Sequence, residues 1–484
     1  MKIKINLARN LLTLSALVIF VLNTPQSRGQ TLGDEINMGP GFEPVVSCDR
    51  RVSSSDADKR IQFVWTYSHQ IYRAISHQLG ATSSWIVGVP SNDVSLNTDP
   101  FAVSDIWSTA PTVPRIMYFG WLGTDATNID YFARSQSGTN VDSGPEVAQG
   151  NAGDNRPWLA VDKASLYLSF AGASGGYVKQ ATIPTGTPSP PPVDWSHNPV
   201  PVLSPSPSPG TTLLSNVHIA AHSDSGGNEI AFVMGLQYVR PQPPCTGANL
   251  VRIQRSVNQG AWGDEEAVKI GGFDGFVYGR DDRMLNFHIT RDPSTSSSYV
   301  YAFYVRNEAN PYPAGPPKRN VLYCTVSPDG GNSWNGARVV FAPLPSDLAP
   351  NFAPEPPNCS GNHDGFYRIG RVWSSVDDNG NVYVAWMDNR YGQYNATKDY
   401  WHVFCARSTH HGDSWDPPFR VSGTSNPQAS ASIGGFDGYD HVPPGDVLTC
   451  DVDSIYLYVA WPDSRNQQGN PTLPPQAYFR HVQF

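Results

Sequence analysis

Long apolar runs and charge are what this sequence has least of. Beyond residue 22, no stretch reaches the ~20 apolar residues that a membrane-spanning helix needs. Charged side chains make up only 15% of the chain and leave a formal net charge of −9, which argues against nucleic acid or an anionic membrane surface as a partner. No Cys-x-x-Cys pair occurs, so a zinc site of the usual spacing is not expected.

Turn-forming and aromatic residues are abundant instead. Glycine and proline each occur 43 times, and Trp, Tyr and Phe together make up 11% of the 484 residues. This mixture is typical of many short strands joined by long loops. The length allows two or three ordinary domains, or one large domain built from repeats.

The first 29 residues have the pattern of a secretory signal peptide. A basic start precedes an apolar run from Leu11 to Leu22, and Ser27-Arg-Gly29 offers small residues for cleavage. A membrane anchor is the alternative, but the run is shorter than the ~20 residues of a spanning helix. We therefore expect a secreted or periplasmic protein with one domain over residues 30–484 and no membrane span.

One apolar strand that ends in an aromatic residue recurs along the chain at irregular spacing. Its alternation and its Val, Ile, Tyr and Phe content mark β-structure. Another strand precedes it and one that usually ends in Ser follows it, so each unit holds about four strands, as a propeller blade does. The seven copies are Ile61–Trp65, Ile116–Trp121, Leu166–Phe170, Ile230–Phe232, Tyr299–Phe303, Val382–Trp386 and Ile455–Trp461.

These repeats predict an all-β fold, a β-propeller of seven four-stranded blades. Six blades are the alternative, because the third unit is rich in Pro and Ser and poor in the turn motif described below. The last unit ends at Phe484 after three strands, so a stretch within residues 31–43 is expected to supply its outer strand and close the ring. Cys48 and Cys450 occupy equivalent points in the first and last units, and we expect a disulfide between them.

Two turns carry closely related motifs. Ser327-Pro-Asp329-Gly-Gly331-Asn-Ser333-Trp334 is followed by Ser408-Thr-His410-His-Gly412-Asp-Ser414-Trp415, and Ser256-Val-Asn258-Gln-Gly260-Ala-Trp262 is a version that lacks one position. The short polar side chains can hydrogen-bond nearby backbone, and the glycine permits a positive φ. A structural role is therefore expected for Ser327, Asp329, Gly331, Trp334, Ser408, Gly412 and Trp415.

The motifs resemble the Asp-box, or BNR, repeats of the sialidase superfamily of β-propellers, over nearly all of residues 40–484. The strand ends Trp386-Met-Asp388-Asn-Arg390 and Trp461-Pro-Asp463-Ser-Arg465 agree with it, and we expect their Asp–Arg pairs to tie strand ends. The resemblance implies a glycoside hydrolase with three arginines on a sugar carboxylate, a Tyr nucleophile activated by a Glu, and an Asp acid/base. The Phe/Tyr-Arg-Ile-Pro motif of the first sialidase arginine is not found, and Tyr367-Arg368-Ile369-Gly370 is the nearest text.

Three Asp-Gly turns, at Asp274, Asp364 and Asp437, lead into the innermost strands of three units. Such loops converge on the axis of a propeller, where ligands bind. We take these carboxylates, Tyr367 and His441 as catalytic candidates, with simple turn formation as the alternative role of the aspartates. Cations and aromatic rings that follow closely are expected to hold a sugar: Arg280, Arg283, Arg368, Arg371, Tyr278 and Tyr439.

The expected function is that of an exported, sialidase-like propeller that acts on extracellular carbohydrate, with glycoside hydrolysis as the leading chemistry. The alternative is a non-catalytic propeller that binds glycan or protein, which the missing arginine motif and the total of only eight glutamates favour. Proton abstraction by a His/Tyr pair, as in a polysaccharide lyase, is a further alternative. No cofactor is expected, except that calcium suits the hard oxygen ligands of the three Asp-Gly turns.

Overall fold

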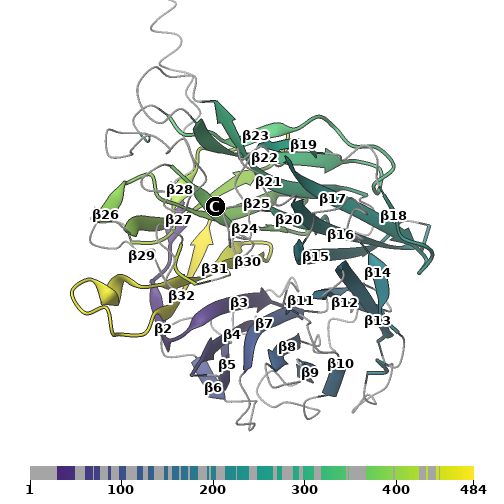
Figure 1. The fold of residues 1–484 in the computed structure, drawn as a ribbon, viewed down its shortest axis with the longest axis horizontal. Coiled ribbons are helices and arrows are strands. Elements are labelled where there is room, and N and C mark those ends of the chain that lie inside the picture. Colours follow the sequence, from purple (N-terminus) through teal and green to yellow (C-terminus); the bar gives the residue numbers. More distant parts are fainter. Residues whose placement is uncertain are drawn as a thin grey trace, which may run out of the picture.

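The computed structural model describes the chain from residue 30 to residue 484, apart from a set of connecting segments. The described strands form seven antiparallel sheets arranged around an axis (Figure 1). The residues outside this description are 1–29, 50–59, 69, 77–84, 89–96, 105–116, 124–128, 136–145, 151–154, 163–164, 173–174, 184–192, 196–197, 203–212, 225, 239–247, 265–269, 275–286, 294–297, 310–317, 345–346, 348–366, 396–397, 424–431, 434–442 and 446.

The sheets follow one another along the chain. The first three comprise β3 (Phe42–Cys48), β4 (Ile61–Tyr67), β5 (Gln70–Ser76) and β6 (Trp85–Gly88); β7 (Asn97–Ser104), β8 (Met117–Gly123), β9 (Ile129–Ser135) and β10 (Glu146–Gly150); and β11 (Asn155–Val161), β12 (Ser165–Gly172), β13 (Gly175–Thr182) and β14 (Val200–Val202). The fourth and fifth comprise β15 (Leu213–Ser223), β16 (Glu229–Tyr238), β17 (Ala248–Val257), β18 (Gly263–Asp264) and β19 (Ile270–Asp274); and β20 (Phe287–Arg291), β21 (Val300–Ala309), β22 (Lys318–Ser327) and β23 (Arg338–Phe341).

The last two sheets carry additional short strands. The sixth comprises β24 (Ile369–Val376), β25 (Val382–Asp388), β26 (Gln393–Asn395), β27 (Lys398–Ser408), β28 (Phe419–Arg420) and β29 (Ser432–Ile433). The seventh comprises β30 (Thr449–Val452), β31 (Tyr456–Asp463) and β32 (Gln476–Gln483), together with β1 (Thr31–Leu32) and β2 (Ile36–Pro40) from the other end of the chain. In the part of the chain that the structure describes, no helix is long and apolar enough to cross a membrane.

The first strand of each sheet is the innermost one. These strands contact one another in chain order around the axis, and β30 of the last sheet contacts β3 of the first, so the ring is closed. Each recurring apolar segment found in the sequence forms the second strand of its sheet, from β4 to β31. The prediction of an all-β propeller is confirmed.

The two ends of the chain close the ring together, as the sequence predicted. Ile36 in β2 pairs with Phe479 in β32, and Thr31 in β1 pairs with Gln483. The Glu35 carboxylate reinforces this junction, because it accepts hydrogen bonds from the Arg465 guanidinium and, at 2.8 Å, from the backbone N–H of Gly423.

The hydrophobic core lies between the faces of neighbouring sheets. One cluster joins the fourth, fifth and sixth sheets, another the sixth and seventh, and a further one packs Phe63 and Trp65 of the first sheet against Phe479 of the seventh. A sheet of this kind is therefore buried on both faces only when its neighbours on both sides are in place.

The expected disulfide between Cys48 and Cys450 is not formed, and this prediction was wrong. β3 and β30 are neighbours, because the Cys48 N–H donates to Asp451 Oδ2 at 2.9 Å. The two thiols nevertheless lie in different core clusters, Cys48 between the seventh and first sheets and Cys450 between the sixth and seventh. Cys48, Cys324, Cys405 and Cys450 are all buried thiols outside any disulfide, whereas Cys245 and Cys359 lie outside the described residues.

Removal of the carboxylate at the closure is expected to loosen the ring. Glu35→Ala removes the largely buried carboxylate that Arg465 and Arg480 share and leaves Arg465 only its pair with Asp463, so we expect a loss of about 2 kcal/mol in the free energy of unfolding. Denaturant unfolding checks this, with Arg338→Ala as the matched control because its pair with Asp413 is solvent-exposed and worth ~0–1 kcal/mol. Equal losses in the two variants would contradict the role of Glu35.

Candidate functional site

The innermost strands all begin at one end of the ring and end in a hairpin turn at the other. The Asp-box turns follow the third strand of a sheet and therefore lie at the second end. The loops that lead into the innermost strands enter at the first end, which is where the sequence placed a ligand site. We call this end the axial mouth and define it by Glu43, Asp99, Arg156 and Arg371.

A β-bulge near the start of four innermost strands presents these charged residues. The pairing register shifts around each of them, in β3, β7, β11 and β24. All four have a left-handed backbone, with φ of 55° at Glu43, 46° at Asp99, 51° at Arg156 and 56° at Arg371. Such a conformation costs a non-glycine residue roughly 1–3 kcal/mol, and bulges of this kind often re-aim side chains next to functional sites.

The mouth residues also connect one sheet to the next. Glu43 of the first sheet accepts a hydrogen bond from the backbone N–H of Asp99 in the second, at 2.9 Å, and one from Thr66 Oγ1 at 3.4 Å. Arg371 of the sixth sheet donates to the carbonyl oxygen of Gly445, just before the innermost strand of the seventh. All four mouth residues are less than one-tenth exposed, so their charges are concentrated in a weakly solvated region.

Four aromatic rings fill the channel below the mouth. Trp158 of the third sheet and Trp373 of the sixth have ring centroids only 4.8 Å apart, although their sheets are not neighbours, so this contact crosses the axis. His218 stacks on Trp158 at 5.0 Å, and His288 lies 4.1 Å from Trp373. We call Trp158, His218, His288 and Trp373 the axial plug.

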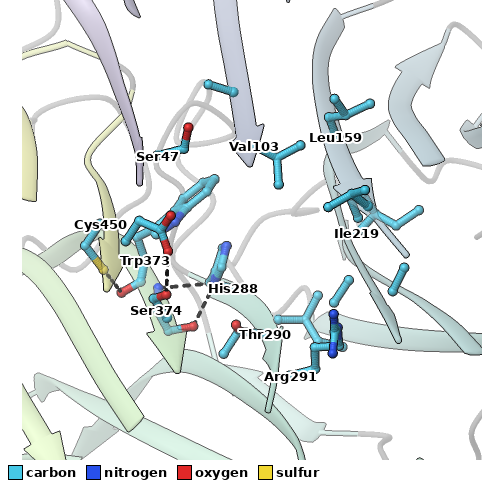
Figure 2. A pocket seen from close by; sticks show the side chains of 18 of the residues that line it. Ser47, Val103, Leu159, Ile219, His288, Thr290, Arg291, Trp373, Ser374 and Cys450 are labelled. Carbon is cyan, nitrogen blue, oxygen red and sulfur yellow. Dashed lines mark hydrogen bonds between the residues drawn. The ribbon is translucent and has the colours of Figure 1, made fainter. Parts of the chain in front are cut away.

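A cavity continues on the far side of the plug. It holds about 780 Å³ of empty space, a figure that includes open solvent at its entrance, and the innermost strands of all seven sheets line it. Figure 2 shows Trp373 and His288 at its wall, with Thr290 and Arg291 beside them. Asp451 lines it too, but its carboxylate accepts hydrogen bonds from Ser375 Oγ and from the N–H groups of Cys48 and Val452.

The buried histidines of the channel are uncharged at neutral pH. Burial, with the nearby Arg156 charge, lowers the pKa of His218 to about 3. Burial, with Arg291 close by, lowers the pKa of His222 to about 4. Burial also lowers the pKa of His288 well below its usual value.

The tautomer of His288 follows from its contacts. Its Nδ1 accepts the backbone N–H of Ser374 at 3.2 Å and lies 2.7 Å from Ser374 Oγ, so the ring proton is on Nε2. The unprotonated Nδ1 of His288 is therefore engaged by Ser374, and this contact fixes the orientation of the imidazole ring. A neutral imidazole with a protonated Nε2 can donate a hydrogen bond to a ligand but is a weak base.

The structure describes three of the predicted site residues in full, and they are adjacent on and before β24. Arg371 is one of the mouth residues. The Arg368 side chain is buried, and its backbone N–H donates to Asn389 Oδ1 at 2.7 Å. Tyr367 is fully buried in the core and donates to Asp388 Oδ2 at 3.3 Å, and its pKa is raised by burial and by Asp388. We therefore correct its assignment from catalysis to the core.

The other predicted site residues fall outside the described part of the chain. Asp274 is the last residue of β19, but its side chain is not described. Those that lie in undescribed segments are Asp364, Asp437, His441, Tyr278, Arg280, Arg283 and Tyr439. Among the residues that the structure does describe, no group of three or more His, Cys, Asp or Glu side chains could hold a metal ion.

The Asp-box turns have the hydrogen bonds that the sequence predicted. Ser327 Oγ accepts the N–H of Gly331 at 2.7 Å, and Asp329 accepts the N–H and hydroxyl of Ser333. In the second box, Ser408 Oγ accepts the N–H of Gly412 at 2.9 Å, and the Trp415 ring packs edge-on against Phe303 of the preceding sheet. Gly331 and Gly412 have φ of 85° and 80°, and Trp334 packs on the core.

The two Asp–Arg pairs tie strand ends, as predicted. Arg390 donates to both carboxylate oxygens of Asp388, and Arg465 donates to Asp463. Each aspartate also accepts from a tryptophan of its own strand, at 2.9 Å from Trp386 Nε1 and at 3.2 Å from Trp461 Nε1. Both carboxylates are therefore engaged in hydrogen bonds and ion pairs that stabilise the fold.

The sequence also carries a signal for the mouth, outside the motifs from which the site was predicted. The segments Glu43-Pro-Val-Val-Ser-Cys-Asp49, Asp99-Pro-Phe-Ala-Val-Ser-Asp105 and Arg156-Pro-Trp-Leu-Ala-Val-Asp162 share a charged residue, a proline and an aspartate at the same spacing. Arg371-Val-Trp-Ser-Ser-Val-Asp377 is a fourth copy without the proline. This repeat is easily missed because the charge varies in sign between copies.

Comparison with known proteins gives only distant likenesses. No family model matches the chain, and no curated protein matches its sequence. Among solved structures, a polysaccharide lyase of family PL25, an ulvan lyase, is similar with a TM-score of 0.45 at 11% identity, over 92% of this chain and 95% of the lyase.

Two glycoside hydrolases are similar at a comparable distance. An α-L-arabinanase of Penicillium chrysogenum has a TM-score of 0.35 at 11% identity, over 79% of this chain and 92% of the arabinanase. The Hadza microbial sialidase Hz136 has a TM-score of 0.39 at 8% identity, over 88% of this chain and 74% of the sialidase.

The buried histidines predict acid sensitivity. His218 and His222 have pKa values of about 3 and about 4 in the folded protein, whereas an unfolded histidine titrates near ~6.5. As the pH falls below ~6.5, only the unfolded chain takes up these protons, so stability is full above that pH and is lost on acidification. Each histidine is expected to cost about 2 kcal/mol at pH 5 relative to pH 7.

Urea unfolding measured between pH 7.5 and pH 5 checks this expectation. His218→Phe keeps an aromatic ring against Trp158 but removes one titrating group, so its stability should fall less steeply with pH. Unfolding midpoints that do not change with pH in the unmodified protein would contradict the buried, neutral state of these histidines.

Proposed function

We propose that this protein binds an acidic glycan at the axial mouth and hydrolyses its glycosidic bonds. The observation that carries the proposal is the set of four charged residues, each in a strained left-handed conformation, at the same point of four innermost strands. Strain of this kind persists where the surrounding structure holds it, and it clusters at ligand-binding and catalytic sites.

The charges of the mouth suit a sugar that carries a carboxylate. Arg156 and Arg371 come from the third and sixth sheets, and a guanidinium fork binds a carboxylate through two parallel hydrogen bonds. Glu43 and Asp99 come from the first and second sheets and supply the pair of carboxylates that glycoside hydrolysis needs. Low exposure of all four strengthens these interactions relative to water.

The wider setting that we propose rests on the sequence. The chain is exported through the signal sequence of residues 1–29, so its substrates are extracellular glycans. Each of the seven sheets counts as one blade of the proposed ring. The Asp-box turns support the resemblance to sialidase-type propellers, and Asp274, Asp364 and Asp437 stay proposed as catalytic residues.

A non-catalytic, glycan-binding propeller is the second candidate function. The Glu43 carboxylate favours it, because this group already accepts hydrogen bonds from Asp99 N–H and Thr66 and so has a structural task at the bulge. A carboxylate used in this way fixes the mouth without taking part in a reaction.

Loss of a mouth arginine is expected to abolish recognition of the acidic sugar. Arg371→Ala and Arg156→Ala should each lower kcat/KM on uronic-acid or sialylated glycans by about 100-fold, since a charge-assisted bidentate contact is worth roughly 1.5–3 kcal/mol. Release of reducing ends measures hydrolysis, and ultraviolet absorbance of an unsaturated uronate would reveal elimination instead. Arg338→Ala, with its exposed side chain on β23, is the matched control.

Circular dichroism and the unfolding midpoint establish that each variant folds, and Arg371→Lys supplies a version that keeps the charge but not the fork. Unchanged cleavage in both folded alanine variants would exclude the axial mouth as the site.

Glu43→Gln separates the two candidate functions. It keeps an oxygen to accept from the Asp99 N–H but removes the charge, so an enzyme should lose about 100-fold or more in kcat while retaining glycan affinity. Calorimetry and rate measurements on the same samples check this. Binding of glycans without cleavage by the unmodified protein would establish the non-catalytic function.

A further inference from the structure

A second groove lies between the outer parts of the third and fourth sheets, at the Asp-box end of the ring. It holds about 850 Å³ of empty space, a figure that includes open solvent at its entrance. Figure 1 shows the paired strands β13 and β14 at this rim. We call it the rim groove, and the residues that matter for its chemistry are Tyr167, Gln180, Asn198, Ser256, Gln259 and Trp262.

The rim groove is polar without being charged. None of the described residues that line it carries a charged side chain, whereas amides, hydroxyls and two large aromatic residues are present. Trp262 is partly buried against the core and partly exposed. Amides and hydroxyls match sugar hydroxyls, and an aromatic face matches the apolar face of a sugar ring. The absence of charge along the lining favours an uncharged ligand.

A partly buried hydrogen-bond network holds this lining in place. Glu229 accepts from Tyr167 OH at 3.2 Å and from Gln259 Nε2 at 3.3 Å. The Gln180 amide nitrogen donates to Tyr167 OH at 3.3 Å and to Ser165 Oγ at 3.1 Å. Because its NH₂ group is engaged, Gln180 offers its carbonyl oxygen as the remaining acceptor. A lining that is ordered in advance loses less entropy when a ligand binds.

The shortened box explains why the groove lies at this point. In the complete box, Ser327 Oγ accepts the N–H of Gly331, whereas in the shortened turn Ser256 Oγ donates to the carbonyl oxygen of Gly260 at 2.8 Å. Asn258 and Gln259 have φ of 49° and 60°, whereas in the complete box the positive φ values fall on Gly330 and Gly331. This different turn places Gln259, Gly260 and Trp262 in the groove wall.

We propose that the rim groove is a second carbohydrate site, which binds uncharged sugar residues with Trp262 as the stacking platform. Ser165, Ser256 and Thr182 lie where strands end or begin at the Asp-box end, opposite the axial mouth. The site is therefore separate from the proposed catalytic mouth. A glycan held there keeps the protein on its polymer while the mouth acts on acidic residues.

Calorimetry with the full-length mature protein and neutral gluco-, galacto-, manno-, xylo- and arabino-oligosaccharides tests this proposal. We expect at least one of them to bind, and Trp262→Ala to weaken that binding by about tenfold or more, which is ~1.4 kcal/mol. Gln180→Ala should weaken it as well. Trp334→Ala is the matched control, because Trp334 has the equivalent place in a complete box and does not line the groove.

Two further measurements keep this site distinct from the mouth. Trp262→Ala should cleave a small soluble acidic substrate as fast as the unmodified protein, and Arg371→Ala should still bind the neutral oligosaccharide. If no neutral oligosaccharide binds, or if Trp262→Ala and Trp334→Ala bind equally well in their folded state, the rim groove is not a carbohydrate site. Failure of the mouth variants to lose cleavage would concern the proposed function alone.

Discussion

Closure of the ring is the constraint on which the rest of the structure depends. Apolar clusters of the described residues lie between neighbouring sheets, so an open ring would expose two sheet faces to water. The strands β1 and β2 remove this exposure by completing the last sheet beside β32. The Glu35 carboxylate then fixes the junction through Arg465 and Gly423.

The two ends of the closed ring differ in which residues adopt a positive φ. At the Asp-box end, Gly330, Gly331 and Gly412 supply most of the positive φ values of the two boxes, and short polar side chains satisfy the backbone. At the axial mouth, charged residues adopt the same backbone region without a glycine. The strain is tolerated because neighbouring sheets hold the bulges, as the contact between Glu43 and Asp99 shows.

The fold was predictable from local patterns, and the site was predictable only in part. The repeated strands, the boxes and the two Asp–Arg pairs are each written within a few residues, so periodicity and turn chemistry were enough to interpret them. Arg371 was predicted as a binding residue, and it remains part of the proposed site. Tyr367 was misassigned because its place in the core depends on Asp388, which lies on a different strand. The pairing of Cys48 with Cys450 failed for a similar reason, since equivalent positions in two repeats need not face the same core cluster.

The sequence by itself determined the elements of this protein: which segments are strands, where the turns are, and that the chain repeats. It did so because hydrophobic alternation and glycine conformation act over a few bonds. Only the tertiary structure decided which side chains meet around the axis. Trp158 and Trp373 touch across the ring, and Glu43 reaches Asp99, because closure brings innermost strands together that the sequence separates by tens to hundreds of residues. Such contacts depend on the summed geometry of all the sheets, which no local pattern records.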